Sequence, residues 1–150
     1  MSCGGDDDEC TLMLNIPSNF NQTVFMDNIS TIESYLTDNG LTAQKTSSGL
    51  YYIFDTPGDS IKPTLCNNVT VNYRGYLPNG NVFDASSIEG VTFPLTNVIL
   101  GWGEGIPLFG EGGEGVLLIP SYLGYGTNPP PGSGIPQNSV LIFDVALLNF

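Results

Sequence analysis

The hydrophobic residues of the first third of the chain repeat with the period of an α-helix. Between residues 23 and 39 apolar side chains recur at spacings of four, three and four positions, which places them on one face of a helix. They are Phe25, Ile29, Ile32 and Leu36. Asn39 and Gly40 follow, and this pair favours a helix end because both residues tolerate a left-handed conformation. We predict one amphipathic helix over residues 23–39.

From residue 49 onward the hydrophobic pattern changes to the period of a β-strand. Val69, Val71 and Tyr73 alternate with polar residues and would share one face of a strand. Pro78 to Asn81 contains Asn-Gly, a favourable hairpin turn. The other apolar runs that predict strands are residues 50–54, 82–84, 91–95, 116–119 and 140–148. Five or so strands with one leading helix predict an α+β fold in which a helix covers an antiparallel sheet.

The charge balance excludes whole classes of partner and mechanism. The 150 residues carry 15 acidic and 3 basic side chains, a net charge of -12, and no histidine. Nucleic acids and anionic lipid surfaces are bound mainly by clustered Lys and Arg, so we expect no nucleic-acid partner. Without histidine the chain lacks the usual general base, histidine-activated nucleophiles and imidazole-bound metals. We expect neither a metal site nor a cofactor.

The N-terminal residues have the composition of a flexible tether. Residues 1–20 open with Met-Ser-Cys-Gly-Gly and an acidic run, which cannot bury enough surface to fold. This start is similar to the mature end of a bacterial lipoprotein, which implies acylation of Cys3 and membrane attachment only through it. An ordinary disordered terminus is the alternative. Under the lipoprotein interpretation Cys10 and Cys66 could form a disulfide in an oxidising compartment; two buried, reduced cysteines are the alternative.

A set of aromatic residues with one acidic residue among them carries the candidate chemistry. It consists of Tyr73, Phe83, Phe93, the single Trp102, Tyr125 and Phe143, together with Asp84. A plain hydrophobic core would account for any one of these aromatics. Asp84 directly follows Phe83 at the start of a strand, so one of the two side chains points inward. A carboxylate facing an apolar pocket is costly and usually functional.

Seven segments, in order along the chain, resemble the FKBP family of peptidyl-prolyl cis-trans isomerases. They are residues 69–75, 79–86, 93–95, 98–102, 119–126, 135–136 and 141–145. The resemblance covers residues 49–150 and implies a curved antiparallel half-barrel of about five strands wrapped round one short helix that begins near Leu100. The predicted helix would be an addition to that domain. We therefore divide the chain into a flexible acidic tether over residues 1–20, a helical extension over 21–48 and an isomerase domain over 49–150.

The resemblance also implies a binding hollow and the residues that form it. Trp102 would be its floor. Its walls would be Tyr73, Phe83, Val98, Ile99 and Phe143, with Phe93 and Ile135 at the periphery. Asp84 would lie at the rim, while the Tyr125 hydroxyl and the Ile99 backbone N–H would hold substrate carbonyls. Val91 stands near a place where the family often has an aromatic residue, and no Arg follows Asp84 to pair with it.

The implied function is rotation about X–Pro bonds, assisting the folding of envelope or secreted proteins in the bacterial periplasm or at the outer membrane. Proline-containing polypeptides would be the substrates and macrolides of the kind the family binds would be inhibitors. One alternative is a catalytically weak FKBP-like binding or chaperone module of the envelope. A second is a surface protein whose exposed aromatic residues bind glycans, which predicts a shallow platform in place of a pocket.

Overall fold

The N-terminal helix predicted from the apolar stripe is present in the computed structural model, which describes residue 18 and residues 20–150. Helix α2 spans Gln22–Asp38, one residue earlier at each end than predicted. The Asn21 side chain caps its N-terminus by accepting a hydrogen bond from the Val24 backbone N–H at 3.1 Å. At the other end Gly40 has φ +64°, the left-handed conformation that glycine adopts without strain.

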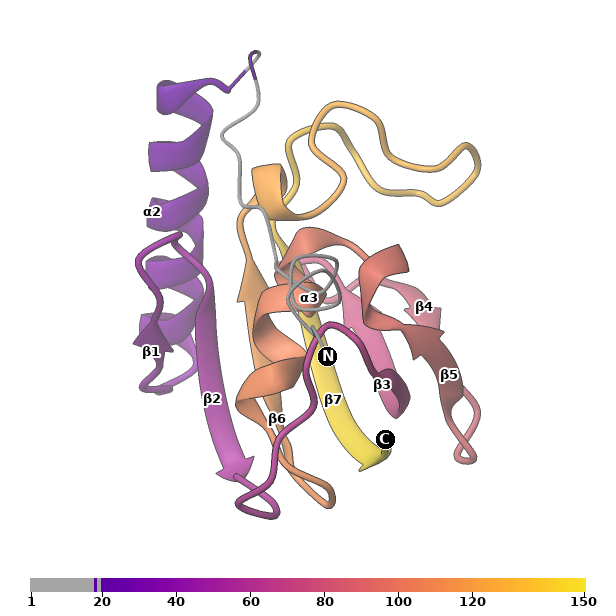
Figure 1. The fold of residues 1–150 in the computed structure, drawn as a ribbon. Coiled ribbons are helices and arrows are strands. Elements are labelled where there is room, and N and C mark those ends of the chain that lie inside the picture. Colours follow the sequence, from indigo (N-terminus) through magenta and orange to yellow (C-terminus); the bar gives the residue numbers. More distant parts are fainter. Residues whose placement is uncertain (1–17, 19) are drawn as a thin grey trace.

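The strands form one antiparallel sheet, which confirms the predicted α+β class. Its spatial order is β1-β2-β6-β7-β3-β4, and β5 also pairs with β3. The strands are β1 (Gln44–Lys45), β2 (Tyr51–Thr56), β3 (Asn68–Tyr76), β4 (Val82–Ala85), β5 (Val91–Pro94), β6 (Glu114–Ile119) and β7 (Leu141–Asn149). The two-residue β1, which the hydrophobic pattern does not indicate, extends one edge. In Figure 1 the sheet runs between α2 on one side and β4 and β5 on the other.

The short central helix α3 (Leu100–Gly105) packs on the face of the sheet that we call the inner face. It begins at the residue the family resemblance implies. Its glycines permit a close approach to β6, since a Cβ on Gly101 would lie 2.7 Å from the Ile119 side chain and one on Gly105 would lie 2.8 Å from Leu117. The glycines that weaken the helix intrinsically therefore let it contact the sheet. Leu117 and Ile119 are fully buried there.

Helix α2 covers the opposite, outer face of the same strands. Ile32 and Leu36 pack with Leu118 and Ile142, whose neighbours along β6 and β7 point to the inner face, as the alternation of a strand requires. Tyr51 on β2 also belongs to this cluster, and its hydroxyl donates a hydrogen bond to the Glu33 carboxylate of α2 at 2.8 Å. Burial and this carboxylate raise the pKa of Tyr51 to about 12.

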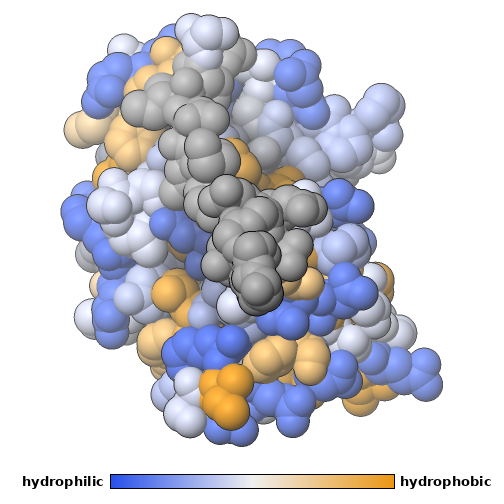
Figure 2. All heavy atoms as spheres, in the orientation of Figure 1, coloured by the Kyte–Doolittle hydropathy of each residue, from blue (hydrophilic) through white to orange (hydrophobic). Residues whose placement is uncertain are grey.

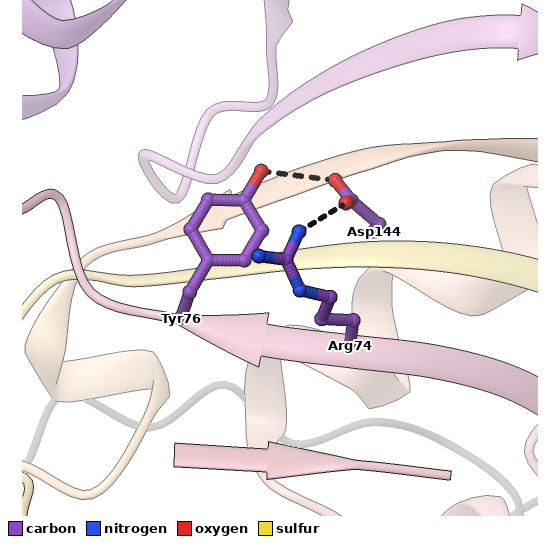
Figure 3. Close-up of polar contacts among 3 residues, drawn as sticks. All are labelled: Arg74, Tyr76 and Asp144. Atoms are coloured by element: carbon purple, nitrogen blue, oxygen red, sulfur yellow. Dashed lines mark hydrogen bonds and ion pairs between the residues drawn. The ribbon is translucent and has the colours of Figure 1, made fainter. Parts of the chain in front are cut away.

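A polar contact group lies beside that outer core (Figure 3). Tyr76 of β3 donates a hydrogen bond to the Asp144 carboxylate of β7 at 2.9 Å, and Arg74 lies 3.8 Å from the other carboxylate oxygen. The Arg74 guanidinium also stacks 5.1 Å from the Tyr76 ring. Burial, then hydrogen bonds with Tyr35 of α2 and with Asp144, raise the pKa of Tyr76 well above its usual range. These contacts give hydrogen-bond and ionic partners to the polar groups of Arg74, Tyr76 and Asp144. The Arg74 and Asp144 side chains are half-exposed there.

The remaining surface shows no broad apolar face in the view of Figure 2. Outside the grey part of that view, hydrophobic residues lie in small groups between hydrophilic ones. None of the helices in residues 20–150 has the length and hydrophobicity needed to cross a membrane.

The predictions about the tether and its cysteines fall mostly on residues that the structure does not describe. Cys3, Cys10 and the tether over residues 1–20, except residues 18 and 20, lie outside the described residues. Cys66 is disulfide-bonded, which excludes the reduced alternative for this residue. Its pairing with Cys10 stays a prediction.

Candidate active site

A cavity of about 220 Å³ opens on the inner face, and nearly all the predicted site residues line it. Its walls are Tyr73, Phe83, Asp84, Phe93, Asn97, Val98, Ile99, Trp102, Tyr125 and Phe143. Ile135, expected at the periphery, is not among them; it is buried in the inner core. Val91 does not line the cavity either, because it lies on β5 opposite Val71 and is exposed. We call this cavity the aromatic hollow.

Trp102 forms the floor of the aromatic hollow, and only 3% of its surface is exposed. Three rings surround it nearly edge-on, with centroids at 5.1 Å for Tyr73, 5.4 Å for Phe93 and 5.3 Å for Phe143. Such perpendicular pairs are favourable because the positive edge of one ring meets the negative face of the other. Phe83 extends the wall by contacting Phe143 at 5.5 Å. The result is a packed aromatic cage round one flat indole face.

A glycine on β3, Gly75, leaves room for the rings of the aromatic cage. Gly75 on β3 pairs with Asp84 of β4 on one side and with Phe143 of β7 on the other. A Cβ at position 75 would lie 2.7 Å from the Phe143 ring and 2.8 Å from the Phe83 ring. Because glycine has no side chain, these two rings can meet over the backbone of β3. Tyr73, two residues earlier, points to the same inner face.

The carboxylate at the rim has a tyrosine partner. Asp84 is exposed and accepts a hydrogen bond from the Tyr73 hydroxyl at 3.0 Å. Burial, then this hydrogen bond and the charge of Asp84, raise the pKa of Tyr73 to about 12. The phenol is therefore neutral and donates at physiological pH. Tyr73 supplies an orienting contact for Asp84 in a chain that has no Arg in the following residues.

Two donors at the edge of the hollow are available to a ligand. In the described part of the chain neither the Tyr125 hydroxyl nor the Ile99 backbone N–H makes a hydrogen bond. Burial and the nearby Asp84 charge raise the pKa of Tyr125, so its hydroxyl keeps its proton. These are the two groups that the resemblance assigns to substrate carbonyls.

Two features of the hollow were not predicted from the sequence. Asn97 lines the cavity, yet nothing in its sequence context distinguishes it from a loop residue. The indole Nε1–H of Trp102 is buried and has no hydrogen-bond partner in the described residues, which is unusual for a buried donor. No group of three or more His, Cys, Asp or Glu that could hold a metal occurs in the described part of the chain.

The comparisons with known proteins agree with this geometry. Residues 59–148 match the FKBP-type peptidyl-prolyl cis-trans isomerase family. A probable FKBP-type isomerase FkpA of Neisseria meningitidis is 43% identical over 120 residues, which cover 77% of this chain and 44% of that protein. FkpA of Buchnera aphidicola (Acyrthosiphon pisum) is 40% identical over 141 residues, 92% of this chain and 54% of that protein. The chain thus spans about half the length of these relatives.

Solved structures show the same fold. The crystal structure of FkpA from Escherichia coli superposes with a TM-score of 0.72 and 36% identity, over 85% of this chain and 61% of that one. A peptidyl-prolyl cis-trans isomerase from Pseudomonas syringae gives a TM-score of 0.72 with 26% identity, over 91% of this chain and 97% of that one. Sequence, fold and hollow together show that this chain belongs to the FKBP-type peptidyl-prolyl cis-trans isomerase family.

Proposed function

We propose that the chain catalyses cis–trans isomerisation of X–Pro bonds in polypeptides, with the proline ring on Trp102. The observation that carries this proposal is the aromatic hollow itself, whose floor is a single buried indole face framed by three perpendicular rings. Macrolides of the kind the family binds would compete for the same hollow. A glycan-binding platform is disfavoured, because that alternative predicts a shallow surface of exposed rings, whereas Trp102 and the surrounding rings line a cavity of about 220 Å³.

The proposed mechanism needs no nucleophile, base or metal. Rotation about the X–Pro bond breaks no covalent bond, but it crosses a barrier of about 18–20 kcal/mol because amide resonance is lost as the bond twists. The twisted amide is less dipolar than the planar one, so an apolar cage disfavours the ground state relative to the transition state. Each ~1.4 kcal/mol gained in this way corresponds to a tenfold rate increase.

The polar groups at the rim would hold the flanking peptide while the bond turns. The Tyr125 hydroxyl and the Ile99 N–H donate to substrate carbonyls on either side of the hollow. Asp84, which the Tyr73 hydroxyl contacts at 3.0 Å, faces the same opening and is the one charged side chain in its described lining. Because the other described lining residues are uncharged, we expect a preference for an apolar residue before proline.

The test is the isomerisation rate of a short proline peptide, followed by NMR exchange between its cis and trans signals. We expect acceleration at micromolar protein, no effect of EDTA, and a lower rate for Tyr125→Phe, which removes one hydroxyl. Ile61→Ala is the matched control, because Ile61 is 68% exposed and lines no part of the hollow. Peptide binding without acceleration would favour the alternative, a catalytically weak binding or chaperone module.

We further propose that the protein acts in the bacterial cell envelope on the folding of envelope or secreted polypeptides. The disulfide at Cys66 supports this, because disulfides persist in oxidising compartments such as the periplasm. Attachment through an acylated Cys3, with the residues between Cys3 and Phe20 as the tether, is part of the same proposal. Mass spectrometry of the protein from its native host tests it, and an unacylated Cys3 would contradict the anchoring.

A further inference from the structure

A second cavity lies next to the aromatic hollow, between the N-terminal half of α2 and the loop that follows β6. It measures about 370 Å³, within the range of about 300–1,000 Å³ usual for ligand sites, whereas the hollow at 220 Å³ is below that range. Its described lining comprises Phe20, Asn21, Val24, Phe25, Asn28, Ser121, Tyr122, Gly124, Tyr125, Gly126, Thr127, Asn128 and Asn138. In Figure 1 the start of α2 and the long loop between β6 and β7 lie at the same end of the molecule.

Tyr125 joins the two cavities, because it lines both. Three residues before it, Tyr122 forms a wall of the second cavity, with its ring 5.4 Å from Phe20 and 5.5 Å from Phe25. The Tyr122 hydroxyl donates to the Ser48 backbone carbonyl, which fixes this wall from behind. Tyr125 is thus a shared wall of the two cavities, and a polypeptide with its proline on Trp102 would have to cross Tyr125 to enter the second one.

The described lining of the second cavity is uncharged. Its described lining contains no Asp, Glu, Lys or Arg. The rings of Phe20, Phe25 and Tyr122 form one part of the wall, and the amide of Asn128 and the hydroxyl of Thr127 belong to another. A charged side chain placed here would lose water without gaining an opposite charge. A peptide backbone carrying an aromatic or aliphatic side chain fits both parts of the wall.

A buried hydrogen-bond network holds the cavity open in this shape. The Asn28 side chain of α2 is 6% exposed, and its Oδ1 accepts from the Ser121 N–H at 2.9 Å and from the Ser121 hydroxyl at 2.6 Å. Its Nδ2 donates to the Asn138 carbonyl at 3.1 Å. Asn138 in turn donates its N–H to the Gly126 carbonyl at 2.8 Å. The helix and the loop that carries Tyr125 are thus linked through polar groups that are all satisfied, which favours a preformed site.

We propose that this second cavity is a subsite for the substrate, which binds an uncharged segment two to four residues from the proline. The inference rests on the proposed function and extends it. Helix α2 contributes Val24, Phe25 and Asn28 to the subsite, and it lies outside residues 59–148, the part that matches the family. The helix would then take part in substrate selection in addition to covering the sheet.

The experiment compares blocked peptides of two lengths. The short peptide is Ala-Leu-Pro-Ala, and the long one is Phe-Ala-Ala-Leu-Pro-Ala-Ala-Phe, in which the first Phe lies four residues and the second three residues from the proline, about 13 Å and about 10 Å of extended chain. A third peptide has Glu in place of both Phe. We expect kcat/KM of the long peptide to exceed that of the short one about tenfold, as for one well-placed apolar group, with the gain mainly in KM. The Glu peptide should show no gain.

Two substitutions test whether the gain comes from this cavity. Val24→Glu puts a charge into the subsite, and Thr23→Glu is its matched control, since Thr23 is exposed beside it in the same helical turn and does not line the cavity. We expect Val24→Glu to reduce the long-to-short ratio to about twofold or less, and Thr23→Glu to keep it. Thr127→Trp, an exposed position in the loop, fills the cavity without a charge and should reduce the ratio in the same way.

The outcomes separate the subsite from the proposed function. If the short and long peptides are isomerised equally well, or if Val24→Glu and Thr127→Trp leave the ratio unchanged, the subsite is rejected while the isomerase function stands. If no peptide is isomerised, the proposed function fails. In that case the dissociation constants measured through Trp102 fluorescence decide the subsite: tighter binding of the long peptide, lost in Val24→Glu, supports it, and equal binding overturns it.

Discussion

The two faces of the sheet are built from the same strands, yet one is closed and the other is open. On the outer face, α2 covers Leu118 and Ile142 with Ile32 and Leu36. On the inner face, α3 has only six residues, and its glycines sit directly on β6. It covers part of the sheet and leaves the rings around Trp102 facing a cavity.

Polar groups differ between the faces in the same way. On the outer face, the hydroxyls of Tyr51 and Tyr76 have carboxylate partners within the fold, Glu33 and Asp144. At the inner opening, Tyr125 has an unused hydroxyl and the Trp102 Nε1–H has no partner in the described residues. The long helix α2 covers the outer face and stabilises the fold, whereas the short helix α3 leaves polar groups of the inner face available for a ligand. We therefore expect outer-face substitutions to change stability and inner-face substitutions to change activity.

The largest effect on stability should come from truncating the outer core. Ile32 is fully buried under α2, so Ile32→Ala removes packing and leaves a cavity, at a cost of about 2–5 kcal/mol in the free energy of unfolding. Urea denaturation measures it. The kcat/KM for a short proline peptide, corrected for the folded fraction, should stay near that of the wild type. A large loss of kcat/KM in the folded fraction would show that packing on the outer face also controls the activity of the inner face.

Trp102→Leu should give the opposite pattern. Leucine keeps an apolar floor but lacks the flat face, so we expect kcat/KM to fall at least about tenfold, or ~1.4 kcal/mol of transition-state stabilisation. The fold should be retained, as judged by far-UV circular dichroism and urea unfolding. If Trp102 were only core, truncation would reduce stability strongly while the folded fraction kept its activity.

A matched pair of tyrosines sharpens the comparison further. Tyr51 donates to the Glu33 carboxylate at 2.8 Å on the outer face, and Tyr73 donates to Asp84 at 3.0 Å on the inner face. Replacing either with Phe deletes the same kind of hydrogen bond, worth about 1 kcal/mol. We expect similar small losses of stability by urea denaturation, but a lower kcat/KM only for Tyr73→Phe. Equal activities would indicate that the orientation of Asp84 does not matter.

The smallest effect is a pH dependence at the alkaline end. The pKa values of Tyr51 and Tyr73 rise from 10.0 to about 12 on folding, so the folded chain holds these protons more tightly than the unfolded one. Their contribution to stability is complete below pH 10 and is lost as the pH rises through 12. Unfolding measured from pH 8 to 12 should show this decline, less steeply in either Phe variant. A flat profile over that range would contradict the raised pKa values.

Regular spacing made α2 and β3 predictable from the sequence. The stripe that includes Ile32 and Leu36 located α2 within one residue, and the alternation of Val69 to Tyr73 located β3. The start of α3 could not be read from propensity, because Gly101, Gly103 and Gly105 disfavour a helix in isolation. Packing against Leu117 and Ile119 stabilises α3 in the fold. Only the family resemblance indicated that a helix begins near Leu100.

The cavity beside α2 could not be predicted because its key contact is polar. Asn28 lies three positions after Phe25 and four before Ile32, so helical spacing places it on the apolar side, but a polar amide at such a position does not by itself indicate a cavity. It is buried because Ser121, 93 positions along the chain, supplies matching hydrogen bonds. Ile135, which the resemblance placed at the periphery of the hollow, does not line it and is buried in the inner core, so its role in substrate binding stays a prediction.

The central claim is that substrate binds on Trp102, and the most direct test is a fluorescence titration. Trp102 is the only tryptophan in the chain, so its emission reports this one position without a label. We predict that a proline peptide or a family macrolide changes the emission and lifetime of Trp102, with a midpoint equal to the concentration that inhibits isomerisation by half. Complete inhibition with an unchanged spectrum and lifetime would show that the active site lies elsewhere.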